Sequence, residues 1–170
     1  IGYNALSTED TGQKNVAIGT NALATLNYNG DGYNTAVGND AGRYMTTGTL
    51  NTLVGGLSGD ALTVGNSNVA IGYQSLTSET QGDRNVAIGF GTLSQQNNTS
   101  STDAYNVAVG YNTGTNVTTG GDNVIIGGLA GDALTTGSNN VAIGKEALST
   151  EDTSSDNTAV GYRALKVQNS

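Results

Sequence analysis

The 170-residue chain contains no cysteine, no histidine, no proline and no tryptophan. Without cysteine it can form neither a disulfide, nor a thiolate nucleophile, nor a cysteine-ligated zinc site. Histidine is the commonest metal ligand and general base, so its absence also excludes a Ser-His-Asp catalytic triad. We therefore expect a protein that is not an enzyme and that holds no metal and no cofactor.

Charged residues are also scarce, at 12% of the chain, and most of them are acidic. The formal net charge is -8 and the sequence pI is about 4.1, so the phosphate backbone of a nucleic acid would be repelled. No apolar run approaches the ~18–20 residues of a membrane-spanning helix. We therefore expect no nucleic-acid partner and no membrane insertion.

A five-residue motif, Asn-(Val/Thr)-Ala-(Ile/Val)-Gly, recurs along the whole chain. Most copies begin 17 residues after the previous one, and two spacings are longer, at 19 and 21 residues. The closing glycine never varies, and Ile1-Gly2 is the end of one further copy. The complete copies begin at Asn15, Asn34, Asn51, Asn68, Asn85, Asn106, Asn123, Asn140 and Asn157 and close at Gly19, Gly38, Gly55, Gly72, Gly89, Gly110, Gly127, Gly144 and Gly161.

The copies also match in groups of four. Residues 1–10 return almost unchanged at 143–152, and residues 55–62 return at 127–134. The two longer spacings follow Asn15 and Asn85, which are four copies apart, so the insertions fall at the same place in each group. We expect residues 1-170 to form a single repeat domain, as a segment of a longer fibrous protein.

A unit of 17 residues is too short for a helical pair or a propeller blade, but it fits one turn, or rung, of a parallel β-solenoid. The motif supplies a strand of β-branched residues, and the intervening residues, rich in glycine and asparagine, supply turns. We predict an all-β parallel β-solenoid (a β-roll or β-helix) of about ten rungs, roughly 47 Å long at ~4.7–4.9 Å per rung. The absence of proline agrees, because every rung must donate backbone hydrogen bonds to its neighbour.

Both faces of the predicted strand are apolar. The first and third residues after the asparagine, such as Val16 and Ile18, share one face, and the second, such as Ala17, lies on the other. One face can line the interior of the rung, and the other needs a cover, for which a partner chain is the simplest choice. Each rung also offers only a few apolar side chains to its core. Both observations predict a homo-oligomer.

A second apolar position lies eight residues after the motif asparagine. It is Leu in two of the four rung types and Gly in the other two, which carry an apolar residue three positions later instead. The enlarged residues Leu53 and Ile125, at the usual Ala position, lie in Gly-containing rungs. This alternation predicts volume compensation along a close-packed core. We also expect the motif asparagines to stack into a hydrogen-bonded ladder.

The motif with its following residues resembles two known kinds of repeat. Asn157-Thr-Ala-Val-Gly-Tyr-Arg-Ala-Leu165 resembles the repeats of phage tail-fibre proteins, and the copy at Asn68, which continues Tyr73-Gln-Ser-Leu76, resembles the head repeats of YadA-like trimeric autotransporter adhesins. The resemblance covers the whole chain. It implies a left-handed β-roll, a homotrimer, an extracellular location on a virion fibre or cell surface, and attachment to a surface.

The two long rungs carry the most distinctive surface, in residues 26–33 and 95–105. Exposed Tyr, Asn and Asp on a rigid rod suit contact with a glycan or a receptor, although a loop expansion without function also explains them. The candidate contact residues are Tyr28, Asn29, Asp31, Tyr33, Asn97, Asn98, Asp103 and Tyr105. The stretch 27–32 resembles the start of a calcium loop, but Gly38 stands where the bidentate Glu is required, so we predict no metal there.

Three further columns of residues recur along the rod. Glu9, Glu79 and Glu151 share one position and lie four rungs apart, about 19 Å, so their charges are well separated. Threonines lie twelve or thirteen residues after the motif asparagine, where an ice-binding array and simple turn chemistry are both open. Aromatic residues follow the closing glycine, either as a stacking ladder for sugars or as a cover for the shoulder of the rod; they are Tyr3, Tyr73, Phe90, Tyr111 and Tyr162.

These features predict a structural and adhesive fibre segment that presents its loops to a host surface or glycan. Its first partner is a further copy of itself. Two alternatives stay open, a self-assembling extracellular β-solenoid filament and a monomeric solenoid that binds ice or a glycan.

Overall fold

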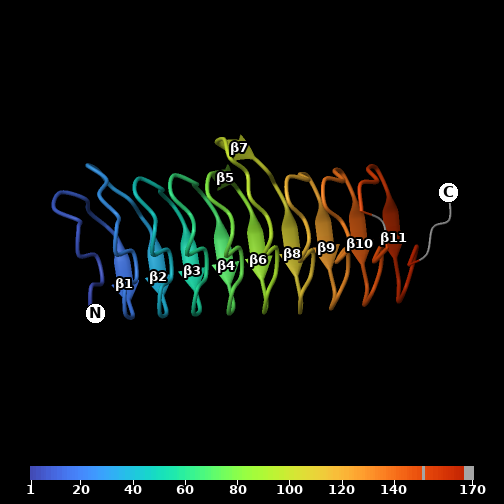
Figure 1. Cartoon of the computed structure of the whole chain (residues 1–170), viewed down its shortest axis with the longest axis horizontal. Helices are drawn as coiled ribbons and strands as arrows, with labels where there is room; N and C mark the ends of the chain where they lie inside the picture. The colour runs from blue at the N-terminus through green and yellow to red at the C-terminus, as the bar shows by residue number, and fades with distance from the viewer. Residues whose placement is uncertain (151, 167–170) are drawn as a thin grey trace.

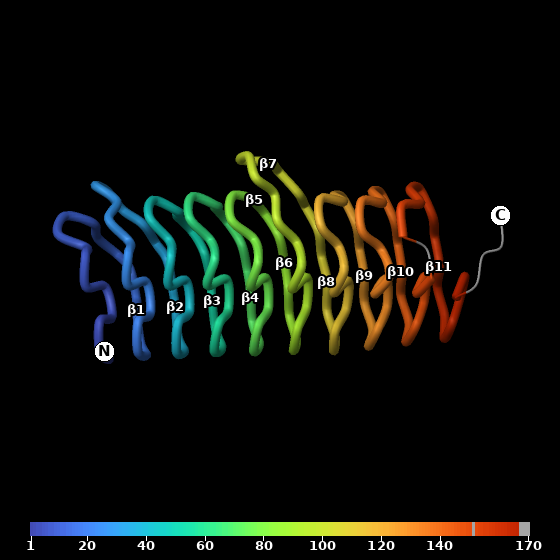
Figure 2. Tube along the Cα trace, viewed as in Figure 1, coloured from blue at the N-terminus to red at the C-terminus, as the bar shows by residue number. Residues whose placement is uncertain are grey.

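In the computed structural model, which describes residues 1–150 and 152–166, the repeats stack into a rod (Figures 1 and 2). The described residues form short strands joined by turns and contain no helix. Each turn of the chain lies beside the next, so the order of rungs along the rod is the order of the sequence. The predicted all-β parallel β-solenoid is confirmed.

Each complete motif contributes one strand to a nine-stranded parallel sheet that runs the length of the rod. The strands are β1 (Val16–Ile18), β2 (Thr35–Val37), β3 (Thr52–Val54), β4 (Val69–Ile71), β6 (Val86–Ile88), β8 (Val107–Val109), β9 (Val124–Ile126), β10 (Val141–Ile143) and β11 (Thr158–Val160). Eight turns separate the nine strands, which at ~4.8 Å per rung span about 38 Å. The incomplete copy at Ile1 forms no strand, although its carbonyl oxygen accepts a 2.8 Å hydrogen bond from Gly19 N.

Every motif pairs with the next at identical positions. Ala17 lies opposite Ala36, and Ala87 lies opposite Ala108, even though a long rung intervenes in each case. The insertions are therefore absorbed outside the sheet. The insertion of the second long rung instead pairs with the rung before it. Its strand β7 (Thr102–Asp103) forms a separate two-stranded parallel ladder with β5 (Gly82–Asp83) of that rung, and β7 projects from one edge of the rod in Figure 1.

The alanine side of the sheet faces the interior. The second strand residue is buried in all nine strands of the sheet, whereas the first and third are half-buried or exposed. The alanine sites and the leucines eight residues after the motif asparagine form one continuous core. The sequence left open which apolar face was interior, and the tertiary structure assigns that place to the smaller residues.

The predicted exchange of volume between rungs is visible in the core. Leu53 fills the space that two glycines leave, because a Cβ placed on Gly42 or Gly59 would come within 2.8–2.9 Å of its methyl groups. Ile125 does the same between Gly114 and Gly131, at 3.0–3.1 Å. Bulk lost at one wall of the rung is therefore restored from the opposite wall, which keeps the packing dense.

The closing glycine of the motif cannot be replaced. At Gly55 the backbone has a φ of 134°, which residues with a side chain rarely adopt. A Cβ there would also lie 2.5 Å from the carbonyl oxygen of Gly72, the same residue of the next rung. Both reasons recur at each motif that has a following rung, so the glycine repeats with the fold.

The motif asparagines form the predicted ladder inside the rod. Asn51 N and Nδ2 donate to Asn34 Oδ1 at 3.0 and 3.2 Å, and Asn51 Oδ1 accepts from Asn68 N at 2.9 Å. Asn51 Nδ2 also donates to Gly65 O at 2.8 Å, which holds the far turn of its own rung to the strand. At Asn51 one side chain thus links neighbouring rungs and closes its own rung with its amide nitrogen and oxygen both paired, whereas Asn15 Nδ2, in the first complete motif, is buried without a partner.

Candidate functional site

The outward sheet face is a chemically uniform surface that runs along the nine-stranded sheet. We use this name for the first and third residues of the nine strands, all of which are Val, Ile or Thr. Ile71 and Ile126 in the middle of the rod are 36% and 37% exposed. This face has no charged residue and no polar group other than threonine hydroxyls. It is a flat aliphatic strip that water still reaches.

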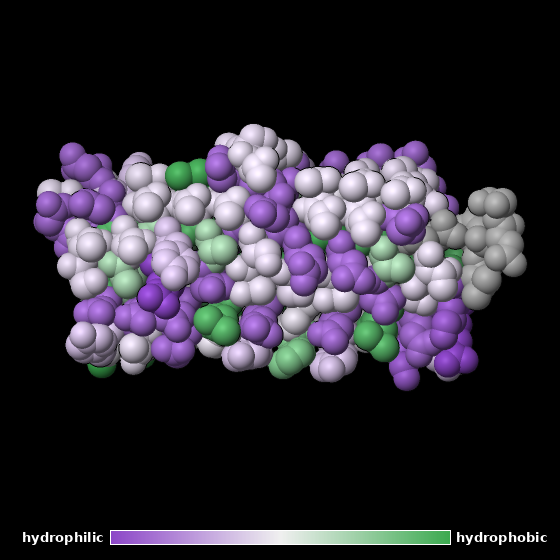
Figure 3. All heavy atoms as spheres, in the orientation of Figure 1, coloured by the Kyte–Doolittle hydropathy of each residue, from purple (hydrophilic) through white to green (hydrophobic). Residues whose placement is uncertain are grey.

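Other parts of the surface are different in character. The face of the rod shown in Figure 3 is hydrophilic or intermediate, with separate hydrophobic spots and no continuous hydrophobic band. The Val and Ile columns therefore do not lie on this face. The rod has an apolar side and a polar side, and the two differ in the partners they can accept.

The first long rung ends in a compact polar cluster. Lys14 Nζ donates to Asp31 Oδ2 at 2.6 Å and to Tyr33 Oη at 2.8 Å, and it lies 4.9 Å from the centre of the Tyr33 ring. Tyr33 Oη donates to Asp31 Oδ2 at 3.2 Å. The hydrogen bond from Lys14 holds the pKa of the Asp31 carboxyl below its usual value, and Asp31 in turn raises the pKa of Lys14.

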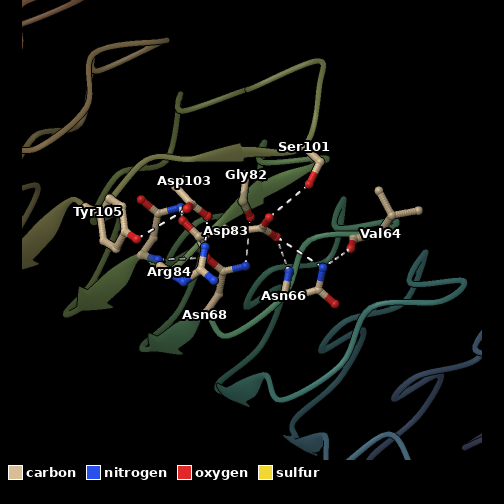
Figure 4. A network of polar contacts seen from close by, with 10 residues as sticks. Val64, Asn66, Asn68, Gly82, Asp83, Arg84, Ser101, Asp103 and Tyr105 are labelled. Atoms are coloured by element: carbon tan, nitrogen blue, oxygen red, sulfur yellow. Dashed lines mark hydrogen bonds and ion pairs between the residues drawn. The ribbon is translucent and has the colours of Figure 1, made fainter. Parts of the chain in front are cut away.

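The second long rung builds the same cluster from equivalent positions (Figure 4). Arg84 forms an ion pair with Asp103 and lies 5.7 Å from the centre of the Tyr105 ring. Tyr105 Oη donates to Asp103 Oδ2 at 3.2 Å, as Tyr33 does to Asp31. Asp83, on the neighbouring strand β5, turns away from this cluster and accepts hydrogen bonds from Asn66 N and Ser101 Oγ. We call the two sets of cation, aspartate and tyrosine the corner clusters.

Most of the sequence-predicted contact residues lie on the surface. Those that are exposed are Asn29, Asp31, Tyr33, Asn97, Asp103 and Tyr105. Tyr28 is half-buried and packs against the core. The expectation that Asn98 is a surface residue is wrong: it is only 6% exposed, because its amide and its backbone N–H both serve a buried carboxylate.

That carboxylate belongs to Glu79, which is fully buried. Its Oε1 accepts hydrogen bonds from Thr80 N, Gln81 N and Gly82 N at 2.7–3.1 Å and from Asn98 N at 3.0 Å. Its Oε2 accepts from Gln96 Nε2 and Asn98 Nδ2, both at 2.9 Å. Glu79 therefore ties the long loop of the next rung to its own turn. From the sequence we inferred only that the charge of Glu79 is well separated from those of Glu9 and Glu151. The recurrence of a glutamate one rung before each long rung was the signal that could have pointed to its anchoring role.

Glu9 anchors the first long rung in the same way, but its carboxylate accepts hydrogen bonds from fewer donors. Its carboxylate accepts from Gly12 N at 2.6 Å, and from Thr11 N and Tyr28 N at 3.3 Å. The third member of the column, Glu151, lies outside the described residues.

The aromatic column forms a short stack in the middle of the rod. The Tyr73 and Phe90 ring centres are 5.6 Å apart, and those of Phe90 and Tyr111 are 5.4 Å apart, with the rings nearly parallel. Both faces of the Phe90 ring are therefore covered by neighbours. A sugar stacked along the whole column has no access to that ring, so only the ends of the stack remain as platforms.

The threonine column is engaged in turn hydrogen bonds. Thr63 Oγ1 donates to Thr80 O at 2.9 Å, and Thr46 and Thr118 make the same bond to the next rung at 3.1 Å. These hydroxyls hold successive turns together, as expected if the threonine column serves the hydrogen bonding of the turns. They supply no observation in favour of an ice-binding array.

The described part of the chain shows no feature of an enclosed or metal-holding site. It forms no detected pocket, and no three of its acidic residues come together in a metal-binding group. None of its segments is a helix with the length and apolarity needed to cross a membrane. Comparison of the chain with protein-family models, curated proteins and solved structures found no match. The surface of the rod therefore holds the features that bear on function.

Proposed function

We propose that this chain is a structural and adhesive segment of an extracellular fibre, associated side by side with further copies of itself as a left-handed homotrimer. The observation that carries the proposal is the outward sheet face, which runs along all nine strands without a charge. A continuous apolar strip of this kind marks an interaction surface, since single exposed apolar residues are ordinary but a contiguous patch is not.

A second copy is the occupant that the geometry of the strip favours. The strip is long, straight and repetitive, so its matching surface must repeat at the same interval of ~4.8 Å over about 38 Å. Another copy of the same chain has that period by construction. Closed cyclic association also covers the strip of every copy and leaves none to aggregate.

The corner clusters then form the adhesive part of the fibre. Their cations and aspartates are 42–50% exposed and lie on loops held by Glu9 and Glu79. Exposed ion pairs add little to stability, so two equivalent clusters on otherwise different loops support a role in contact with a surface. Their spacing of four rungs, about 19 Å, suits a ligand that is engaged at two points.

Light scattering coupled to size exclusion tests the association. We expect a mass of three chains for the native segment and a lower mass for Ile88→Lys, which puts a charge in the middle of the outward sheet face. Ser67→Lys is the matched control, because it adds the same charge in the column that already holds Lys14 and Arg84. A monomer for the native chain contradicts the fibre assembly, and material of undefined mass in the void favours the end-to-end filament.

A further inference from the structure

The aromatic column contains one open position, at Gly128. Along this column Tyr73, Phe90 and Tyr111 are followed on the next rung by Gly128, and then by Lys145. The side chain in this column therefore changes from an aromatic ring at Tyr111 to none at Gly128 and to a cation at Lys145. Because rungs repeat at ~4.8 Å, the omitted side chain leaves about 9.6 Å between the rungs of Tyr111 and Lys145.

The position at Gly128 is empty, whereas the equivalent glycine at the other end of the stack is covered. A Cβ placed on Gly56 would lie 3.3 Å from Cδ2 of Tyr73, so that ring leans over its glycine. A Cβ on Gly128 would meet only the carbonyl oxygen of Tyr111, at 3.9 Å. Tyr111 is also the most exposed of the three stacked residues, at 57%. One face of its ring is free.

The space is the right size for a single ring. Stacked rings in proteins have centres about 4.5–7 Å apart, and the two ring pairs of this column are 5.6 and 5.4 Å apart. A ring seated over Gly128 would continue the stack at the same interval and meet Lys145 on its other side. The position is open to solvent at its outer edge. It therefore suits a ring with an apolar C–H face and polar edges, which is the chemistry of a pyranose.

The charge around this position differs from that of the chain as a whole. The chain carries a net charge of -8, yet half of its six basic residues, Lys145, Arg163 and Lys166, meet around Glu146. Arg163 and Lys166 engage Glu146 closely and lower its pKa to about 2. Lys145 is the loosely held member, with Nζ 3.7 Å from Glu146 Oε1 and a side chain that is 62% exposed. It is the most exposed cation of the three and the one most accessible to a ligand.

We propose that the space over Gly128 is a subsite for an acidic saccharide, whose ring stacks on Tyr111 and whose carboxylate pairs with Lys145. A charge-assisted hydrogen bond to Lys145 orients the sugar, and the Tyr111 ring covers its C–H face. The inference rests on the proposed function in that it names the class of surface ligand the fibre would meet. It does not depend on the oligomeric state.

Titration calorimetry of the native chain with a panel of saccharides tests the subsite. The acidic probes are tetragalacturonate and 3′-sialyllactose, and their matched neutral probes are fully methyl-esterified tetragalacturonate and lactose. We expect binding of at least one acidic probe, and at least about tenfold weaker binding of its neutral partner. Binding of no acidic probe, or equal binding of acid and ester, overturns the proposal.

Three variants then locate the binding. Gly128→Tyr should abolish it by adding a fourth ring to the stack, and Lys145→Gln should weaken it about tenfold. Tyr73→Leu changes the covered end of the stack and should leave affinity within about twofold. Circular dichroism and the scattering mass of each variant show whether the fold and the assembly persist. Native affinity in both Gly128→Tyr and Lys145→Gln contradicts the subsite, whatever the mass measurement says about the fibre.

Discussion

The two long rungs present the same kind of corner cluster, but the second insertion is anchored by more hydrogen bonds than the first. Both end in a corner cluster of cation, aspartate and tyrosine with the same 3.2 Å bond from Tyr to Asp. The first insertion is held by a Glu9 carboxylate with three backbone donors, and a single bridge joins Gln13 to Asp31. The second, longer insertion has the fully buried Glu79 with six donors and a two-stranded ladder. A longer loop needs more anchoring to present the same surface, because it has more chain entropy to lose.

Removing the anchor carboxylate should give the largest difference between the two halves. Glu79→Ala leaves buried N–H groups of the turn and loop without an acceptor, and we expect a loss of about 4 kcal/mol in the free energy of unfolding. Glu9→Ala removes fewer and more exposed bonds and should cost about 1 kcal/mol. Urea unfolding of the two variants measures both values. Glu79→Gln keeps one acceptor oxygen and should fall between them, while equal losses at Glu9 and Glu79 would show that the two anchors do not differ.

The core should behave alike in the two halves. Leu53→Ala and Ile125→Ala each leave a hole flanked by two glycines, and we expect each to cost about 3 kcal/mol. Ile71→Ala, on the outward sheet face, should cost about 1 kcal/mol in an unassociated chain. Thermal or urea unfolding of the three variants checks the order. A loss at Leu53 or Ile125 no larger than that at Ile71 contradicts the volume exchange across the rung.

The smallest effect concerns the titration of the first corner cluster. Because Lys14 lowers the pKa of Asp31, this carboxyl should titrate below its ordinary value of 3.8 in carbon-detected NMR. Its folded pKa is depressed, so its contribution to stability is present above the unfolded pKa and is lost as the pH falls through the folded pKa. Lys14→Gln should move the midpoint back toward 3.8. A midpoint that does not change in this variant means that Lys14 is not the cause.

Much of the fold was predictable from sequence because a solenoid places each residue beside its own copies. The motif asparagine at position 51 meets those at 34 and 68, so a repeating polar residue implies a ladder. The motif glycine meets the same glycine on the next rung, which explains why it never varies. The exchange of bulk between Leu53 and its glycines also follows from the repeat, since the volume of successive rungs must stay constant.

The candidate site was less predictable. The insertions could be located and their Tyr and Asp residues named, but Asn98 and Tyr28 were placed on the surface and lie buried or half-buried. Neither has a copy in the regular rungs from which its environment can be read. Their positions depend on Glu79 and on the path of the inserted loop, which joins residues 17–19 positions apart through contacts without a repeated pattern.

The period, the strands, the ladder and the parallel stack of rungs can be derived from the amino-acid sequence, because they follow from translation of one unit along an axis. The direction in which each side chain points around that axis is a property of the folded chain. The tertiary structure placed alanine inside and the Val and Ile columns outside, closed one end of the aromatic stack, and left the position over Gly128 open. The direction of each side chain around a rung depends on the backbone turns between motifs. In these turns, residues such as Leu57 and Ser67 adopt the left-handed conformation, which their residue types do not predict.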